Sequence, residues 1–132
     1  MTLIDTHAHL YYDSMYNRLD DVLDDAQKNE VNKVICIGTD VNTSKKSVDI
    51  ANKYDCVYAA VGVHPHDSKS VEKNYLKSLE ELALNSKKVV AVGEIGIDHY
   101  RNLSPADVQK RVMIEQMELA KSLSMPLSLI HI

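Results

Sequence analysis

The stretch Lys88-Val-Val-Ala-Val-Gly93, followed directly by Glu94-Ile-Gly-Ile-Asp98, carries the pattern that decides the fold. Its first apolar residues follow one another without alternating with polar ones, which is typical of a strand covered on both faces in a parallel sheet. Runs of the same kind recur at residues 3–6, 33–38, 56–63 and 127–130. The sequence therefore predicts a set of buried parallel strands.

Segments with helical spacing separate these runs. Apolar residues recur every three or four positions over 19–31, 48–54, 71–83 and 108–123, and this alternation predicts an α/β fold. Two architectures share the order, a doubly wound open sheet and a (β/α)8 barrel. A complete barrel needs about 250 residues, so the 132 residues of this chain would form about half of one.

The last helix has the clearest predicted start. Ser104 is suited to the N-cap, Pro105 to the first helical position and Asp107 to the third, which is a variant of the capping box. The apolar line expected to face the core comprises Val108, Val112, Met113, Met117, Ala120 and Leu123.

Composition excludes several classes of protein. The chain is 45% hydrophobic and 26% charged, with a net charge of −4, which is ordinary for a globular domain. No apolar run approaches the roughly 18 residues of a membrane span, and the first residues resemble no secretory signal. Cys36 and Cys56 lie in strand-like runs and are expected to be buried free thiols. We expect one domain over residues 1–132, in the cytoplasm and without a membrane partner.

Four of the six histidines form two tight pairs at the ends of expected strands. In an extended segment, residues two apart point to the same face, so His7 and His9 can converge on one metal ion. Two surface histidines at a strand end would have the same spacing. His64 and His66 form the second pair, with Pro65 stiffening the turn between them.

Glu94 follows a buried strand, where an unpaired carboxylate would be costly. A carboxylate can bridge two cations, whereas a histidine cannot, so Glu94 is the natural shared ligand of a two-metal site. An ion pair with Arg101 is the alternative. Both histidine pairs and Glu94 are expected at the carboxyl ends of the strands, where parallel α/β folds place their active sites.

Three motifs together resemble the TatD family of metal-dependent deoxyribonucleases: residues 5–9 (Asp-Thr-His-Ala-His), 62–66 (Gly-Val-His-Pro-His) and 93–98 (Gly-Glu-Ile-Gly-Ile-Asp). The resemblance spans about residues 3–131. It implies a (β/α)8 TIM barrel of the metal-dependent hydrolase type, here truncated after its fifth strand. It also implies hydrolysis of DNA phosphodiester bonds by a metal-activated water.

The resemblance assigns roles to individual residues. It implies two divalent metal ions (Mg, Mn or Zn), with Glu94 shared between them as a catalytic residue. It makes His64 catalytic at the scissile phosphate. The family's further metal ligands, on a sixth and an eighth strand, have no counterpart in these residues. The chain alone is therefore expected to lack a complete site. The implied metal ligands are His7, His9, Glu94 and His131, and the implied substrate-binding residues are His64, His66 and Arg101.

Two other functions fit the same residues. A metal-dependent amidohydrolase acting on a small substrate would place its ligands at the same strand ends. A non-catalytic half-barrel would expose two open sheet edges, and could self-associate or bind a partner through them. The net charge of −4 disfavours contact with many phosphates along a duplex. This favours a nuclease directed at ends or single strands.

Overall fold

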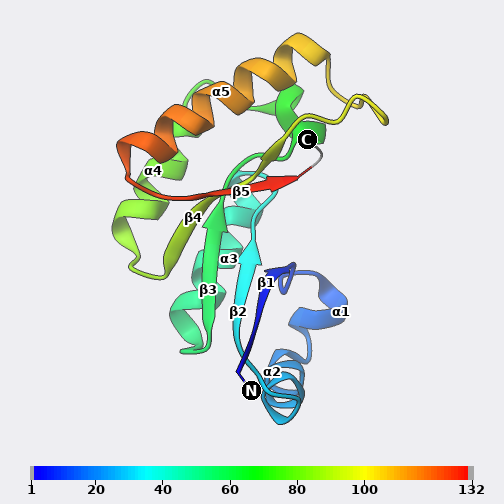
Figure 1. Ribbon diagram of the computed structural model, residues 1–132, viewed down its shortest axis with the longest axis vertical. Coiled ribbons are helices and arrows are strands. Elements are labelled where there is room, and N and C mark those ends of the chain that lie inside the picture. Colours follow the sequence, from blue (N-terminus) through cyan, green and yellow to red (C-terminus); the bar gives the residue numbers. More distant parts are fainter. Residues whose placement is uncertain (1, 131–132) are drawn as a thin grey trace.

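The computed structural model describes residues 2–130 and shows a parallel five-stranded sheet in the order β1-β2-β3-β4-β5 (Figure 1). Each strand pairs with the next one along the chain. The sheet curls into half of a barrel, which confirms the expected (β/α)8 architecture truncated after its fifth strand. The strands are β1 (Leu3–Ala8), β2 (Val31–Ile37), β3 (Val57–Val61), β4 (Val89–Gly96) and β5 (Leu127–Ile130).

Helices occupy the connections between the strands. Within residues 2–130, none has both the length and the apolar character needed to cross a membrane. Two short elements, α1 and η1, were not predicted from periodicity, because each is too short to show an apolar repeat. The helical elements are α1 (Asp13–Tyr16), α2 (Leu19–Lys28), α3 (Val41–Lys53), the 3-10 helix η1 (Pro65–Ser70), α4 (Tyr75–Asn85) and α5 (Ala106–Ser122).

Helix α3 begins well before the predicted 48–54 segment, because a capping box starts it. The Asp40 carboxylate accepts a hydrogen bond from the Thr43 N–H at 2.7 Å, and the Thr43 hydroxyl accepts one from the Asp40 N–H at 2.9 Å. These two bonds satisfy donors that a helix start leaves without intrahelical partners.

The main core lies between the sheet and its covering helices. Cys36 and Val61 from the strands pack there with Leu79 and Val112 from the helices. Successive strand residues point to opposite faces, so Ile37 belongs to a second, smaller cluster with Ala60 and Ala91 on the inner face of the curled sheet. Cys36 is buried as expected, and burial raises the pKa of its thiol, whereas Cys56 is only partly buried.

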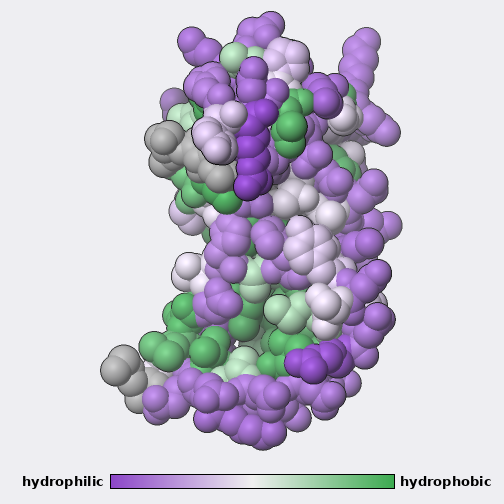
Figure 2. Space-filling model, turned by 90° about the vertical axis from the view of Figure 1, so that its right-hand side faces the viewer, coloured by the Kyte–Doolittle hydropathy of each residue, from purple (hydrophilic) through white to green (hydrophobic). Residues whose placement is uncertain are grey.

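Strand β1 corrects the expectation that every strand is covered on both faces. Leu3 is 44% exposed and Ile4 is 53% exposed, because β1 is an edge strand with β2 as its single neighbour. Leu129 in β5, at the other edge, is 44% exposed. Figure 2 shows hydrophobic residues gathered in the lower part of one face, beside a hollow in the outline of the molecule.

The start of α5 also differs from the prediction. Pro105 is the N-cap residue, and the Ser104 hydroxyl does not cap the helix. It donates to the His66 carbonyl at 2.7 Å and accepts from the Lys69 N–H at 3.1 Å. Ser104 therefore ties the start of α5 to η1.

The buried face of α5 is rotated relative to the predicted apolar line. Met117 is 41% exposed, although the apolar spacing had assigned it to the core. Two fully buried glutamines occupy the inner face instead, because hydrogen bonds described below satisfy their amides. The buried residues are Gln109, Val112, Gln116, Leu119 and Ala120.

Glycines permit close approach of the backbone at the carboxyl ends of the strands. A Cβ atom on Gly62, just after β3, would lie 2.7 Å from the carbonyl carbon of Gly93 in β4. Real Cβ atoms do not come this close to backbone, so a side chain here would push β3 and β4 apart.

We expect the substitution Gly62→Ala to destabilise the fold by about 1–3 kcal/mol, the usual cost of overpacking. Urea unfolding followed by circular dichroism measures this difference. Lys121→Ala, on the exposed side of α5, is the control and is expected to change stability by less than about 0.5 kcal/mol. An unchanged midpoint for Gly62→Ala would show that the two strands can separate at no cost.

Candidate active site

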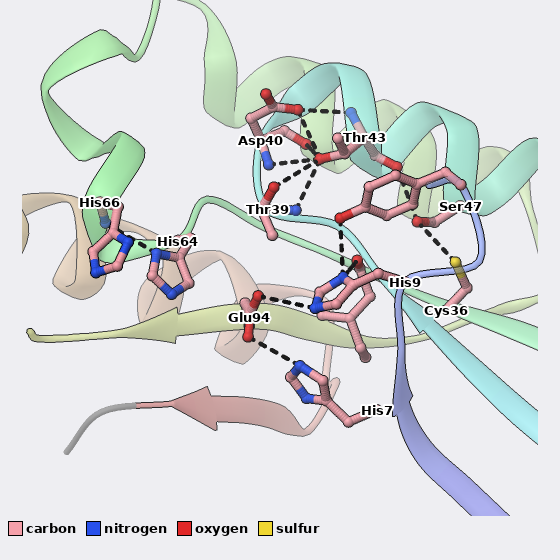
Figure 3. A network of polar contacts seen from close by, with 12 residues as sticks. His7, His9, Cys36, Thr39, Asp40, Thr43, Ser47, His64, His66 and Glu94 are labelled. Carbon is pink, nitrogen blue, oxygen red and sulfur yellow. Dashed lines mark hydrogen bonds and ion pairs between the residues drawn. The ribbon is translucent and has the colours of Figure 1, made fainter. Parts of the chain in front are cut away.

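Two histidines and one glutamate meet at the carboxyl ends of β1 and β4 (Figure 3). His7 lies in β1, His9 directly follows it, and Glu94 lies in β4 and is only 2% exposed. The His7 Nε2 atom is 3.1 Å from Glu94 Oε2, and the His9 Nε2 atom is 3.8 Å from Glu94 Oε1. Sequence predicted these three residues as one group, and the structure places them together.

The His9 ring is held in one tautomer. Its Nδ1 atom is 3.0 Å from the carbonyl oxygen of Ile37 and 3.0 Å from the Tyr11 hydroxyl. A carbonyl oxygen can only accept, so Nδ1 carries a proton and, in the neutral ring, Nε2 presents its lone pair toward Glu94. A lone pair that faces a carboxylate is unfavourable unless a proton or a metal cation lies between them. The arrangement therefore fits a metal ion.

The donor set also fits a divalent metal. One ligand atom from each of His7, His9 and Glu94 can be chosen so that all lie within 4.8 Å of one another. Imidazole nitrogen and carboxylate oxygen are ligands that zinc and manganese accept together. The hydrogen bond from His9 to a backbone carbonyl is the kind of outer contact that orients a metal-binding histidine.

The second histidine pair lies beside this group, after β3. His64 is 8% exposed, and its Nδ1 atom accepts a hydrogen bond from the His66 N–H at 3.0 Å. The neutral His64 ring therefore carries its proton on Nε2. The His66 Nε2 atom is 2.5 Å from a carboxylate oxygen of Asp98, which is 4% exposed.

Asp98 also holds the loop that carries Arg101. Its second carboxylate oxygen accepts from the N–H groups of Tyr100 at 3.0 Å and Arg101 at 2.9 Å. One buried carboxylate thus fixes both the His66 ring and the backbone at Arg101. His66 and Arg101 border a cavity of about 320 Å³, whose lining comprises His9, Tyr12, Thr39, His64, His66, Asp67, Glu94, Arg101 and Ile130.

Two glutamines on α5 support the site, and sequence reasoning missed both. Gln109 accepts from the Asp98 N–H at 2.8 Å and donates to the Ser104 carbonyl at 2.7 Å. Gln116 accepts from the N–H of Val63 at 2.7 Å and donates to its carbonyl at 3.1 Å. Their seven-residue spacing places them on one face of α5, but the predicted core line included apolar residues only.

The loop after β2 supports the same residues, although its sequence indicated no chemistry. The Gly38 carbonyl accepts from the Glu94 N–H at 3.1 Å, and the Thr39 carbonyl accepts from the His64 N–H at 2.8 Å. The loop thereby fixes the backbone on both sides of the cavity. His131, the fifth-strand ligand implied by the resemblance, lies outside the described residues.

Comparison with known proteins gives one family. The family model described as "TatD related DNase" matches residues 4–132. An uncharacterized metal-dependent hydrolase, YabD of Bacillus subtilis, is 36% identical over 129 residues, covering 98% of this chain and 50% of YabD. The 3'-5' ssDNA/RNA exonuclease TatD of Escherichia coli is 36% identical over 107 residues, covering 81% of this chain and 41% of the exonuclease.

A solved structure shares the fold. The crystal structure of YJJV, a TATD homologue from Escherichia coli, superposes with a TM-score of 0.90 at 30% sequence identity. The match covers 96% of this chain and 49% of YJJV. The chain spans about half the length of the curated relatives it matches.

We expect Gln116→Leu to destabilise the fold by about 2 kcal/mol, because it leaves the buried N–H and carbonyl of Val63 without their side-chain partner. Urea unfolding measures the effect. Gln27→Leu makes the same exchange at an exposed position of α2 and is the control. Equal stability of the two variants would contradict a clamping role for Gln116.

Asp67 gives a prediction about pH. Burial, followed by the negative charge of Asp40, raises the pKa of Asp67 above its usual value of 3.8. The folded state therefore binds this proton more tightly than the unfolded state, and folding is disfavoured as the pH rises above the unfolded value. Asp67→Asn should leave the free energy of unfolding unchanged at pH 3 and increase it at pH 7. Urea titrations across this range test the prediction, with the exposed Asp24→Asn as control.

Proposed function

The chain belongs to the TatD family of DNases, and from that premise we propose that it provides part of a divalent-metal-dependent active site that hydrolyses DNA phosphodiester bonds. The observation that carries the proposal is the buried Glu94, which lies against both His7 and His9. A carboxylate in this position is stable when it is paired or coordinates a cation.

We propose two divalent ions, from among Mg, Mn and Zn. Glu94 lies against both His7 and His9, and its carboxylate has two oxygens, so it would bind the ion held by the two histidines and still offer an oxygen to a second ion. His7 and His9 would complete one site, and their imidazoles favour Mn or Zn. A divalent ion supplies positive charge that stabilises negative charge on phosphate oxygens and makes a nearby water more acidic.

The other side chains of the cavity suit a phosphodiester. The neutral His64 ring carries its proton on Nε2 and can donate it in a hydrogen bond to a phosphate oxygen or to the leaving oxygen. Arg101 lines the same cavity, and a guanidinium matches the geometry of phosphate oxygens. His66 is fixed by Asp98 and would bind the substrate beside His64. This concentration of donors favours a phosphodiester over an amide.

We propose a single strand or a frayed end as the form of DNA. A net charge of −4 disfavours the broad phosphate contact that duplex binding needs. Substrate would instead be held locally, at the metal ions and the donors around them. The name of the Escherichia coli relative, a 3'-5' ssDNA/RNA exonuclease, supports this choice.

We expect Glu94→Gln to weaken Mn²⁺ binding by at least about tenfold, because the amide is a poorer ligand than the carboxylate. Isothermal titration of the purified chain with Mn²⁺ measures the affinity. Glu81→Gln changes the same group on the exposed side of α4 and is the control, since Glu81 is 60% exposed.

The same variants test the nuclease. Binding of a fluorescein-labelled single-stranded octadeoxyadenylate should require Mn²⁺, be reversed by EDTA and be lost in Glu94→Gln but not in Glu81→Gln. Any cleavage of the oligonucleotide should show the same dependence. Mn²⁺ affinity that is equal in both variants would place the metal elsewhere, and binding that ignores EDTA would contradict the proposed function.

A further inference from the structure

Tyr12 is an exposed aromatic residue at the edge of the candidate active site, and the proposed chemistry gives it no role. It directly precedes α1 and lines the same cavity as His9, Glu94 and Arg101. Even so, 54% of its surface is exposed. A large, partly apolar side chain that remains open beside a polar cavity is suited to contact a ligand.

The ring of Tyr12 lies against two other rings. Its centroid is 5.4 Å from that of His9, with planes inclined at 43°, and 5.0 Å from that of Tyr11, in an edge arrangement at 68°. His9 is in turn anchored by its bond to the Ile37 carbonyl. These contacts leave the exposed part of the Tyr12 ring available without a change in its neighbours.

The backbone of Tyr12 is also fixed. Its N–H donates to the His9 carbonyl at 3.2 Å, and its carbonyl accepts from the N–H groups of Met15 and Tyr16, both at 2.8 Å. Little conformational freedom would therefore be lost when a ligand packs on the ring, and such preorganisation increases affinity.

We propose that Tyr12 is a stacking platform for a nucleobase that adjoins the scissile phosphodiester. The inference rests on the proposed function and extends it to the recognition of bases. A phosphate held by His64, Arg101 and a metal ion on Glu94 would have its flanking nucleosides at the rim of the cavity, where Tyr12 lies. Every nucleobase has a π face, so stacking on an aromatic ring tolerates any sequence.

Charge gives a reason for such an uncharged contact. Asp67 also lines the cavity, and the chain carries a net charge of −4, so many phosphate contacts along a strand would be opposed. A base inside a duplex is already stacked and paired, and cannot lie on Tyr12 without being removed from the helix. The platform would therefore select single strands.

Another exposed tyrosine provides a matched control. Tyr100 is 96% exposed and neighbours Arg101 in the chain. It is not among the described residues that line the cavity. Removing its ring takes away exposed aromatic surface near the site without affecting the proposed platform.

The experiment compares two probes of equal charge in the presence of Mn²⁺. One is a fluorescein-labelled, phosphorothioate-linked octadeoxyadenylate, and the other is an abasic octamer with the same linkages and label. Anisotropy titrations of the purified chain give the dissociation constants. Tyr12→Leu should weaken binding of the octadeoxyadenylate roughly tenfold or more and leave the abasic probe unchanged. Tyr12→Phe should bind both probes like the parent, as should Tyr100→Leu.

A second measurement uses the parent chain alone, so that it does not depend on the folding of a variant. A single 2-aminopurine placed in each position of a thymidine octamer in turn should lose fluorescence on binding at one position or at two adjacent ones. Equal fluorescence at every position would overturn the platform. Equal weakening of both octamer probes by Tyr12→Leu would also overturn it, since that result assigns Tyr12 a merely structural role.

Failure of the proposed function would look different. In that case the parent chain would bind neither octamer, or would bind both with an affinity that EDTA does not change. Suppose instead that binding requires Mn²⁺ and Glu94, and that the abasic probe binds more weakly than the octadeoxyadenylate by the same factor in Tyr12→Leu as in the parent. That result would retain the nuclease and reject the platform.

Discussion

The curl of the sheet is the constraint on which the candidate site depends. Strands β2 and β3 separate β1 from β4 in the sheet, and three strand spacings in a flat sheet amount to roughly 14 Å. Nevertheless, His7 of β1 lies 3.1 Å from Glu94 of β4. The curvature of the sheet lets these side chains meet across the inner face, where the small residues Ala60 and Ala91 pack with Ile37.

Buried hydrogen bonds then fix the loops that carry the other side chains of the cavity. Gln109 and Gln116 attach the loops after β4 and β3 to one rigid helix, and Asp98 connects the first of these loops to His66. Each contact satisfies polar groups that would be costly to bury without partners. The positions of His64, His66 and Arg101 therefore depend on how α5 packs as well as on the loops themselves.

Sequence patterns predicted the alternation of strands and helices and placed His7, His9 and Glu94 at strand ends that the structure brings together. These patterns mispredicted the exposure of side chains where it depends on the neighbours of a helix or strand and not on that element's own composition. Strand β1 is apolar but lies at an edge, so Leu3 and Ile4 are exposed. Helix α5 buries glutamines and exposes Met117, because backbone groups of neighbouring loops pair with the amides. Periodicity records the polarity of a side chain but not its partner.

The sequence by itself determined the order of the elements, the strand ends at which the candidate site residues lie and the family. These follow from local hydrophobic runs and from short motifs, which need no knowledge of distant residues. Tertiary structure alone decided that Glu94 faces both His7 and His9, which tautomer His9 adopts and that Tyr12 stands open at the cavity. Each of these depends on contacts between segments whose distance is set by the curl of the sheet and by the packing of α5.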